Sequence, residues 1–232
     1  MMYSKSHRYV FIHIPKCAGT SIRQSLRGID GPSRPKRVWN RITGRQNEQP
    51  IVGMPGLHTH SDALQVREAL GMEVYHDNFS FAFVRNPWDR MLSLYNNYWQ
   101  ASLDRAEGRR LPKGLTPEQE RENAERVKAL GFRRWLLAEE LQTEKYGESL
   151  TRRSQLEWLR DDAGQLITSF IGRVETIVDD FSQIQQCLQV NIELAHANQS
   201  QHRHYRDEYC DETRDFVATY FRDDIDMFGY SF

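Results

Sequence analysis

The stretch from Tyr9 to Ile22, with the sequence YVFIHIPKCAGTSI, constrains the fold of this chain more than any other. Its first part, Tyr9 to Ile14, is a short apolar run rich in β-branched residues, which predicts a buried strand. Pro15 ends this strand, Lys16 to Gly19 form a tight turn, and a helix follows from Thr20. We therefore expect a strand, a small-residue turn and a helix in direct succession.

This succession is typical of anion-binding sites, because it directs backbone N–H groups and the positive end of a helix at one point. Lys16 and the hydroxyl groups of Thr20 and Ser21 add donors that suit a phosphate group. The order differs from the Walker loop, in which the lysine follows the glycines, because here Lys16 precedes Gly19. The alternative interpretation is a glycine turn with a surface lysine. Cys17, within the turn, is interpreted as a small buried side chain rather than a reactive thiol.

A second strand–helix junction follows at Arg85. Residues Phe79 to Val84 alternate aromatic and small side chains, which predicts another buried strand. Asn86 is a good N-cap and a proline follows it, so a helix is expected to begin directly after Arg85. Ser93 falls on the polar face of this helix, together with Arg90. The opposite face carries an apolar stripe that predicts core packing: Trp88, Met91, Leu92, Tyr95, Tyr98 and Trp99.

Two histidines, His58 and His60, lie between these junctions. Ser61 is the predicted N-cap of a helix that ends at Leu70, and the positive end of that helix disfavours an imidazolium. We therefore expect neutral rings that can accept a proton. In an extended segment, residues two apart share a face, so both rings can line one acceptor site. The alternatives are packing or surface histidines, or part of a zinc site, which would need at least one more ligand.

Three further elements are expected in the rest of the chain. Residues 118–142 predict a long helix with Gly131 as a weak point. Residues 166–178 predict a late strand, followed by a helix that Asp179 caps. Residues 211–228 predict one amphipathic helix. Its inward side chains are expected to be Phe216, Val217, Tyr220, Phe221, Ile225 and Phe228.

Composition narrows the classes of function. The formal net charge of −1 produces no field that would favour nucleic acid. No apolar run approaches the ~20 residues that a membrane span needs. The three cysteines lie far apart, which favours a reducing compartment, and we expect a cytoplasmic protein. The most basic segment, residues 34–45, is either a solvated loop or a rim that attracts an anionic acceptor.

The motifs resemble those of a known enzyme family. Residues 15–21, PKCAGTS, resemble the 5′-phosphosulfate loop of sulfotransferases that use 3′-phosphoadenosine-5′-phosphosulfate (PAPS). The closest resemblance is to the carbohydrate branch that includes the chondroitin and heparan/uronyl 2-O sulfotransferases. Residues 83–95 resemble the family's 3′-phosphate segment, in which an arginine and a serine eight residues later hold that phosphate, and Arg85 and Ser93 match both positions. Two later blocks, residues 170–175 and 224–232, also resemble family sequences.

The resemblance implies an α/β, three-layer, P-loop-like fold with a central parallel sheet flanked by helices. It implies one sulfotransferase domain over residues 1–232, with a helical insertion around residues 104–151. The activity it implies is transfer of a sulfuryl group from PAPS to a hydroxyl acceptor, most plausibly on a saccharide, without a metal. The implied cofactor-binding residues are Lys16, Cys17, Ala18, Gly19, Thr20, Ser21, Arg85, Ser93 and Arg203.

The resemblance also suggests a base. In members of the 2-O type, the second histidine of a His-x-His pattern accepts the proton, which corresponds to His60, with His58 beside it and Lys16 as the catalytic cation. Other branches use a glutamate, and Glu48 ranks well below His60. Rival functions are a nucleotide-dependent kinase and a non-catalytic nucleotide- or glycan-binding module of the same fold. The acceptor, the oligomeric state, the role of residues 104–151 and the choice between the two histidines stay open.

Overall fold

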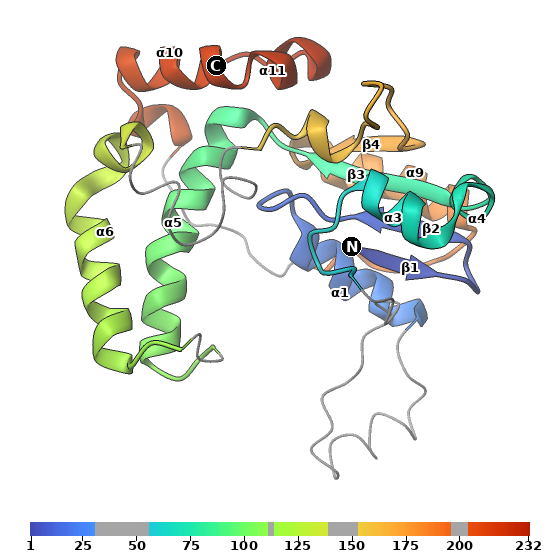
Figure 1. Cartoon of the computed structure of the whole chain (residues 1–232), viewed down its shortest axis with the longest axis horizontal. Coiled ribbons are helices and arrows are strands. Elements are labelled where there is room, and N and C mark those ends of the chain that lie inside the picture. Colours follow the sequence, from blue (N-terminus) through green and yellow to red (C-terminus); the bar gives the residue numbers. More distant parts are fainter. Residues whose placement is uncertain (31–55, 111–113, 139–152, 196–203) are drawn as a thin grey trace. The chain divides into compact units, whose positions relative to one another are not determined.

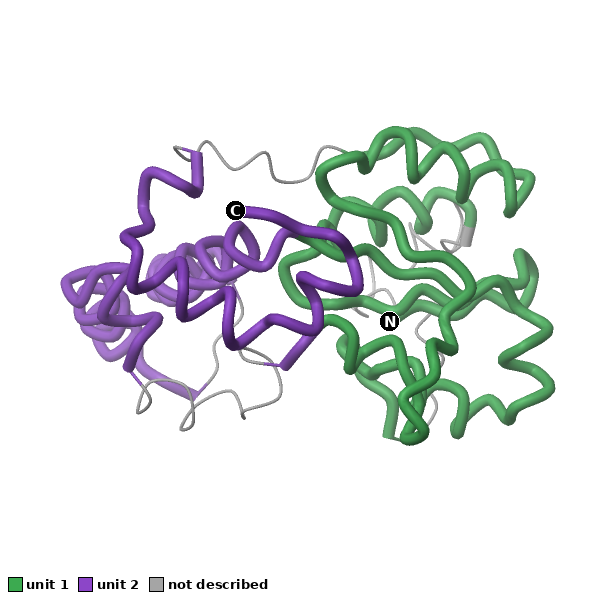
Figure 2. The backbone as a smooth tube through the Cα atoms, turned by 90° about the horizontal axis from the view of Figure 1, so that it is seen from above, with its two compact units in different colours: residues 1–85, 155–200 green, residues 86–154, 201–232 purple. Residues whose placement is uncertain are grey.

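The computed structural model describes residues 1–30, 56–110, 114–138, 153–195 and 204–232. The chain divides into two compact units, which Figure 2 shows in different colours. Unit 1 consists of Met1–Arg85 and Gln155–Ser200, and unit 2 of Asn86–Ser154 and Gln201–Phe232. The predicted anion-binding turn, both histidines and Arg85 belong to unit 1. The single domain with an insertion around residues 104–151 stays a prediction.

Unit 1 contains a four-stranded sheet in the order β1-β2-β3-β4 (Figure 1). The strands are β1 (Met2–Ser4), β2 (Tyr9–Ile12), β3 (Phe79–Val84) and β4 (Phe170–Arg173). β2 and β3 run parallel, as do β3 and β4, and helices flank this sheet, so the predicted α/β class is confirmed. Both central strands are almost continuously buried, which is typical of parallel strands covered on both faces.

The edge strand β1 was not predicted from the sequence, and it pairs antiparallel to β2. Only four residues separate Ser4 from Tyr9, and a parallel pair would need a crossover of a dozen residues or more. The short connection therefore dictates a hairpin, in which Arg8 takes a positive φ of 51°. The strand is only three residues long, which is too short for a sequence pattern to reveal it.

The helices of unit 1 surround this sheet, with α4 packed on β3 and α9 on β4. They are α1 (Gly19–Asp30), α3 (Ala63–Leu70), α4 (Met72–His76), α9 (Ile177–Leu188) and the 3₁₀ turns η1 (Leu156–Trp158) and η2 (Val174–Thr176). Two predicted caps are wrong. Asp62, not Ser61, caps α3, because its carboxylate accepts the Gln65 N–H in a capping box. Asp179 lies inside α9, which begins two residues earlier.

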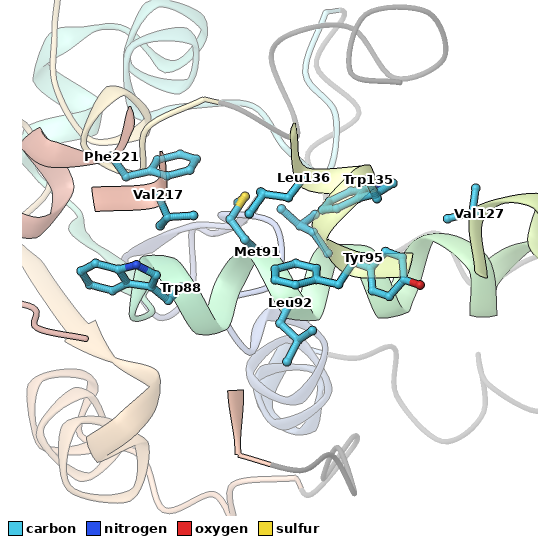
Figure 3. Packing of buried hydrophobic residues seen from close by; sticks show 11 residues of the cluster. Trp88, Met91, Leu92, Tyr95, Val127, Trp135, Leu136, Val217 and Phe221 are labelled. Carbon is cyan, nitrogen blue, oxygen red and sulfur yellow. The ribbon is translucent and has the colours of Figure 1, made fainter. Parts of the chain in front are cut away.

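Unit 2 is built from helices around one apolar cluster. These are α5 (Pro87–Ala106), α6 (Pro117–Leu137), η3 (Tyr205–Glu208), α10 (Asp211–Tyr220) and α11 (Arg222–Phe228). Figure 3 shows how Trp88, Met91, Leu92 and Tyr95 of α5 meet side chains from α6 and from the last helices. The predicted apolar stripe of α5 is therefore core packing. The predicted N-cap Asn86 is confirmed, since its side chain accepts the Trp88 N–H at 3.0 Å.

Three expectations for unit 2 need correction. Arg90, which the sequence predicted on the polar face, is fully buried. Its guanidinium donates to the Arg153 carbonyl at 3.1 Å and lies over the Phe221 ring. The expected single C-terminal helix is two helices that meet at Phe221. Tyr220 is 45% exposed rather than inward. Gly131 does interrupt α6, with a φ of 71°. Among the described helices, none is long and apolar enough to cross a membrane.

Candidate active site

The turn between β2 and α1 has the backbone of an anion-binding loop. Lys16 and Ala18 both have positive φ angles, 69° and 55°, although neither is a glycine. Left-handed residues on either side of Cys17 bend the backbone into a tight turn, in which the Cys17 N–H donates to the Ile14 carbonyl at 3.4 Å, and α1 begins directly afterwards at Gly19. The first N–H groups of any helix lack intrahelical partners. Backbone strain of this kind is common at functional loops, and the N–H groups at the start of a helix suit a negatively charged group.

Cys17 is buried, as interpreted from the sequence. Its thiol donates to the Oε1 atom of Gln155 at 3.2 Å, and Lys16 beside it is half-buried. Thr20 is exposed and Ser21 half-buried at the start of α1. The side chains of Lys16, Thr20 and Ser21 therefore remain at least partly accessible to a phosphate, whereas the buried Cys17 thiol anchors the loop to Gln155.

Arg85 meets this loop. Its NH1 group donates a hydrogen bond of 3.3 Å to the carbonyl of Lys16, and the side chain is half-buried. The contact follows from topology, because β2 and β3 are adjacent parallel strands and the residues after their carboxyl ends lie at one edge of the sheet. The two segments predicted to bind phosphate, 69 residues apart in the chain, thus lie side by side.

His60 lies next to the same loop through His13, the residue after β2. The Nδ1 atom of His60 is 3.0 Å from the carbonyl oxygen of His13, and the two imidazole rings are 4.6 Å apart between centroids. Trp158 approaches His60 edge-on, with 6.3 Å between centroids. The ring of His13 also lies against Gly19, where a Cβ atom would overlap it. His13 therefore connects the predicted base to the start of α1.

A comparison with known protein families places the chain in one of them. A family model described as "Sulfotransferase family" matches residues 1–231. The chain belongs to the sulfotransferase family. No curated protein and no solved structure matches the chain significantly. The family indicates sulfuryl transfer in general, and the loop, Arg85 and the histidines are the features of unit 1 from which its chemistry can be derived.

Hydrogen bonding distinguishes the two predicted histidines of this sulfotransferase. A carbonyl oxygen can only accept, so the Nδ1 atom of His60 carries the proton and its neutral ring has the lone pair on Nε2. The His60 backbone N–H donates to the Nδ1 atom of His58 at 3.1 Å, so the neutral His58 carries its proton on Nε2. His60 thus offers a basic nitrogen, whereas the exposed His58 offers a donor.

Burial keeps His60 neutral. It lowers the pKa of the imidazole below the ordinary value of 6.5, against the opposing effect of the hydrogen bond to the His13 carbonyl. Burial also lowers the pKa of His13 well below that value, with the neighbouring His60 as the next cause. The lowered pKa favours the neutral ring that the sequence predicts, with burial as its largest cause.

Sequence reasoning missed His13, because its position in an apolar run indicated only a strand residue. The sequence did place His13 two residues before Pro15, at the end of the strand that leads into the loop, and this position could have indicated a site residue. Ser93 lies in α5, in unit 2, and is half-buried. Arg203, Glu48 and the basic segment 34–45 lie outside the described residues. Among the residues that the structure does describe, no three His, Cys, Asp or Glu side chains are grouped to hold a metal ion.

The contact between Gly19 and His13 predicts a cost for any side chain at residue 19. In Gly19→Ala, the added Cβ overlaps the imidazole ring, so the free energy of unfolding should fall by about 1–3 kcal/mol. Gly28→Ala, in the same helix, is the matched control, since nothing lies within 4 Å of its Cβ, and it should stabilise by about 0.5–1 kcal/mol. Urea denaturation measures both. Equal stabilities of the two variants would contradict the packing described for His13.

The hydrogen bonds of the histidines predict opposite tautomers. Imidazole ¹⁵N NMR above pH 7 should show a proton on Nδ1 of His60 and on Nε2 of His58. His60 should titrate below pH 6.5. Because the folded state then binds fewer protons than the unfolded chain, the neutral ring's contribution to stability is complete above pH 6.5 and is lost as the pH falls. A His60 midpoint at or above 6.5, or a proton on its Nε2, would refute this arrangement.

Proposed function

We propose that this sulfotransferase moves the sulfuryl group of PAPS to a hydroxyl group, most plausibly of a saccharide, and releases 3′,5′-ADP. The hydrogen bond between Arg85 and the Lys16 carbonyl is the observation that supports the donor most strongly. It joins the two segments that carry the cationic side chains of Lys16 and Arg85, which supports a single ligand with two phosphate groups. The saccharide rests on the sequence resemblance to the carbohydrate branch.

On the donor side, the loop binds the 5′-phosphosulfate. As the bond between sulfur and the bridging phosphate oxygen breaks, negative charge grows on the departing 5′-phosphate. The N–H groups at the start of α1 stabilise that charge without rearrangement, because the helix fixes their direction, and Lys16 adds a positive charge from the same loop. Arg85 binds the 3′-phosphate, since a guanidinium presents two parallel donors to phosphate oxygens. The role of Ser93 as its partner rests on the sequence spacing alone.

On the acceptor side, His60 is the general base. Its Nε2 atom takes the proton of the acceptor hydroxyl while the hydroxyl oxygen forms the new bond to sulfur. The products are a sulfate ester, 3′,5′-ADP and a protonated His60, which returns its proton to water. The Nε2–H group of His58 is suited to orient the acceptor by donating a hydrogen bond. Burial favours the neutral form of His60, so the base is ready at neutral pH.

The proposal predicts that three variants differ in whether they lose nucleotide binding or only sulfuryl transfer. Lys16→Ala and Arg85→Ala should each weaken 3′,5′-ADP binding by about tenfold to a hundredfold, because each removes a charged donor to a phosphate. His60→Ala should bind 3′,5′-ADP as the wild type does, yet lose transfer from labelled PAPS in a screen of saccharide acceptors. Lys5→Ala is the matched control, since Lys5 is exposed in unit 1. Isothermal titration calorimetry measures the binding.

Two results would overturn the proposal. One is tight binding of ATP with magnesium by a wild-type protein that does not respond to 3′,5′-ADP, which would favour a kinase. The other is full turnover by purified His60→Ala, which would remove this histidine from the mechanism.

A further inference from the structure

Gln155 is a fully buried polar residue of unit 1 that no sequence motif marks. It directly precedes η1, and its carboxamide makes three hydrogen bonds to the two segments that the proposed function assigns to phosphate. Its Oε1 atom accepts the Arg85 backbone N–H at 2.8 Å, and its Nε2 atom donates to the Arg85 carbonyl at 2.9 Å. The same Oε1 atom accepts the thiol of Cys17 at 3.2 Å.

The pair of bonds to Arg85 has the geometry of strand pairing. A primary amide offers a donor and an acceptor in one plane, as a peptide group does. The ladder between β3 and β4 ends at the pair Val84 and Arg173. Gln155 therefore hydrogen-bonds both the N–H and the C=O of Arg85, the next residue of the chain, as a residue of another strand would. Without it, the part-buried N–H and C=O of Arg85 would lose these two hydrogen bonds.

The bond to Cys17 makes Gln155 a bridge. Cys17 lies in the loop and Arg85 after β3, and one oxygen atom accepts from both. The Arg85 guanidinium independently donates to the carbonyl of Lys16. Two links therefore join the loop to Arg85, one through the backbone and one through the side chain. Together with the parallel pairing of β2 and β3, the two links restrict both the separation and the relative orientation of the segments.

We propose that Gln155 is a positioning residue that sets the spacing between the loop and Arg85, and thereby makes the site select a nucleotide with phosphates at both the 3′ and the 5′ position over one with a 5′-phosphate alone. This inference rests on the proposed function. Gln155 itself is fully buried, so its side chain is not available to bind either phosphate. Its effect is therefore expected in the preference between nucleotides and not in the affinity for a single phosphate.

The test compares two nucleotides by calorimetry. Gln155→Met keeps the volume and the charge but removes all three hydrogen bonds, so 3′,5′-ADP affinity should fall by about tenfold. The affinity for 5′-AMP, which does not need Arg85, should change far less. The ratio of 3′,5′-ADP affinity to 5′-AMP affinity should therefore fall. Gln165→Met is the control, because Gln165 is exposed in the same unit, and it should leave the ratio unchanged.

Cys17 provides a second pair of variants if Gln155→Met fails to fold. Cys17→Ala removes only the link to Oε1 and should reduce the ratio by about threefold to tenfold, whereas Cys17→Ser keeps a donor and should preserve it. A ratio that stays at the wild-type value in Gln155→Met, or in Cys17→Ala, overturns the inference, as does an equal loss of both nucleotides. A wild-type protein that does not bind 3′,5′-ADP would instead refute the proposed function itself.

Discussion

The hydrogen bond from the Arg85 guanidinium to the Lys16 carbonyl is the interaction on which the proposed chemistry depends. It exists because β2 and β3 pair in parallel, so that the residues after both strands lie at the same edge of the sheet. Each segment alone could serve many purposes. Together they join a loop that carries Lys16 and precedes a helix start to a segment that carries Arg85, which suits a ligand with separated negative charges.

Buried polar side chains hold in place the segments that follow β2 and β3. Gln155 holds the backbone of Arg85 and the thiol of Cys17, and His13 lies between Gly19 and the ring of His60. Burial lowers the pKa of both imidazoles, and nearby cationic side chains act in the same direction. A positively charged loop and an uncharged base are therefore compatible in one site, because the cations disfavour the imidazolium.

The parts of the site that depend on local sequence could be predicted, and the parts that depend on distant contacts could not. The turn from Lys16 to Gly19 and the cap at Asn86 follow from neighbouring residues, so their patterns revealed them. Gln155 lies 70 residues beyond Arg85, and a glutamine before a short 3₁₀ turn carries no pattern of its own. Arg90 was misplaced for the same reason, since its burial depends on Arg153 and Phe221.

The crystal structure of the protein with 3′,5′-ADP tests the central claim most directly. The account predicts the 5′-phosphate against the N–H groups of residues 18–21 and the 3′-phosphate on the guanidinium of Arg85, with both groups on one nucleotide. A nucleotide that contacts the loop with its 5′-phosphate while its 3′-phosphate points away from Arg85, or one bound elsewhere, would contradict it.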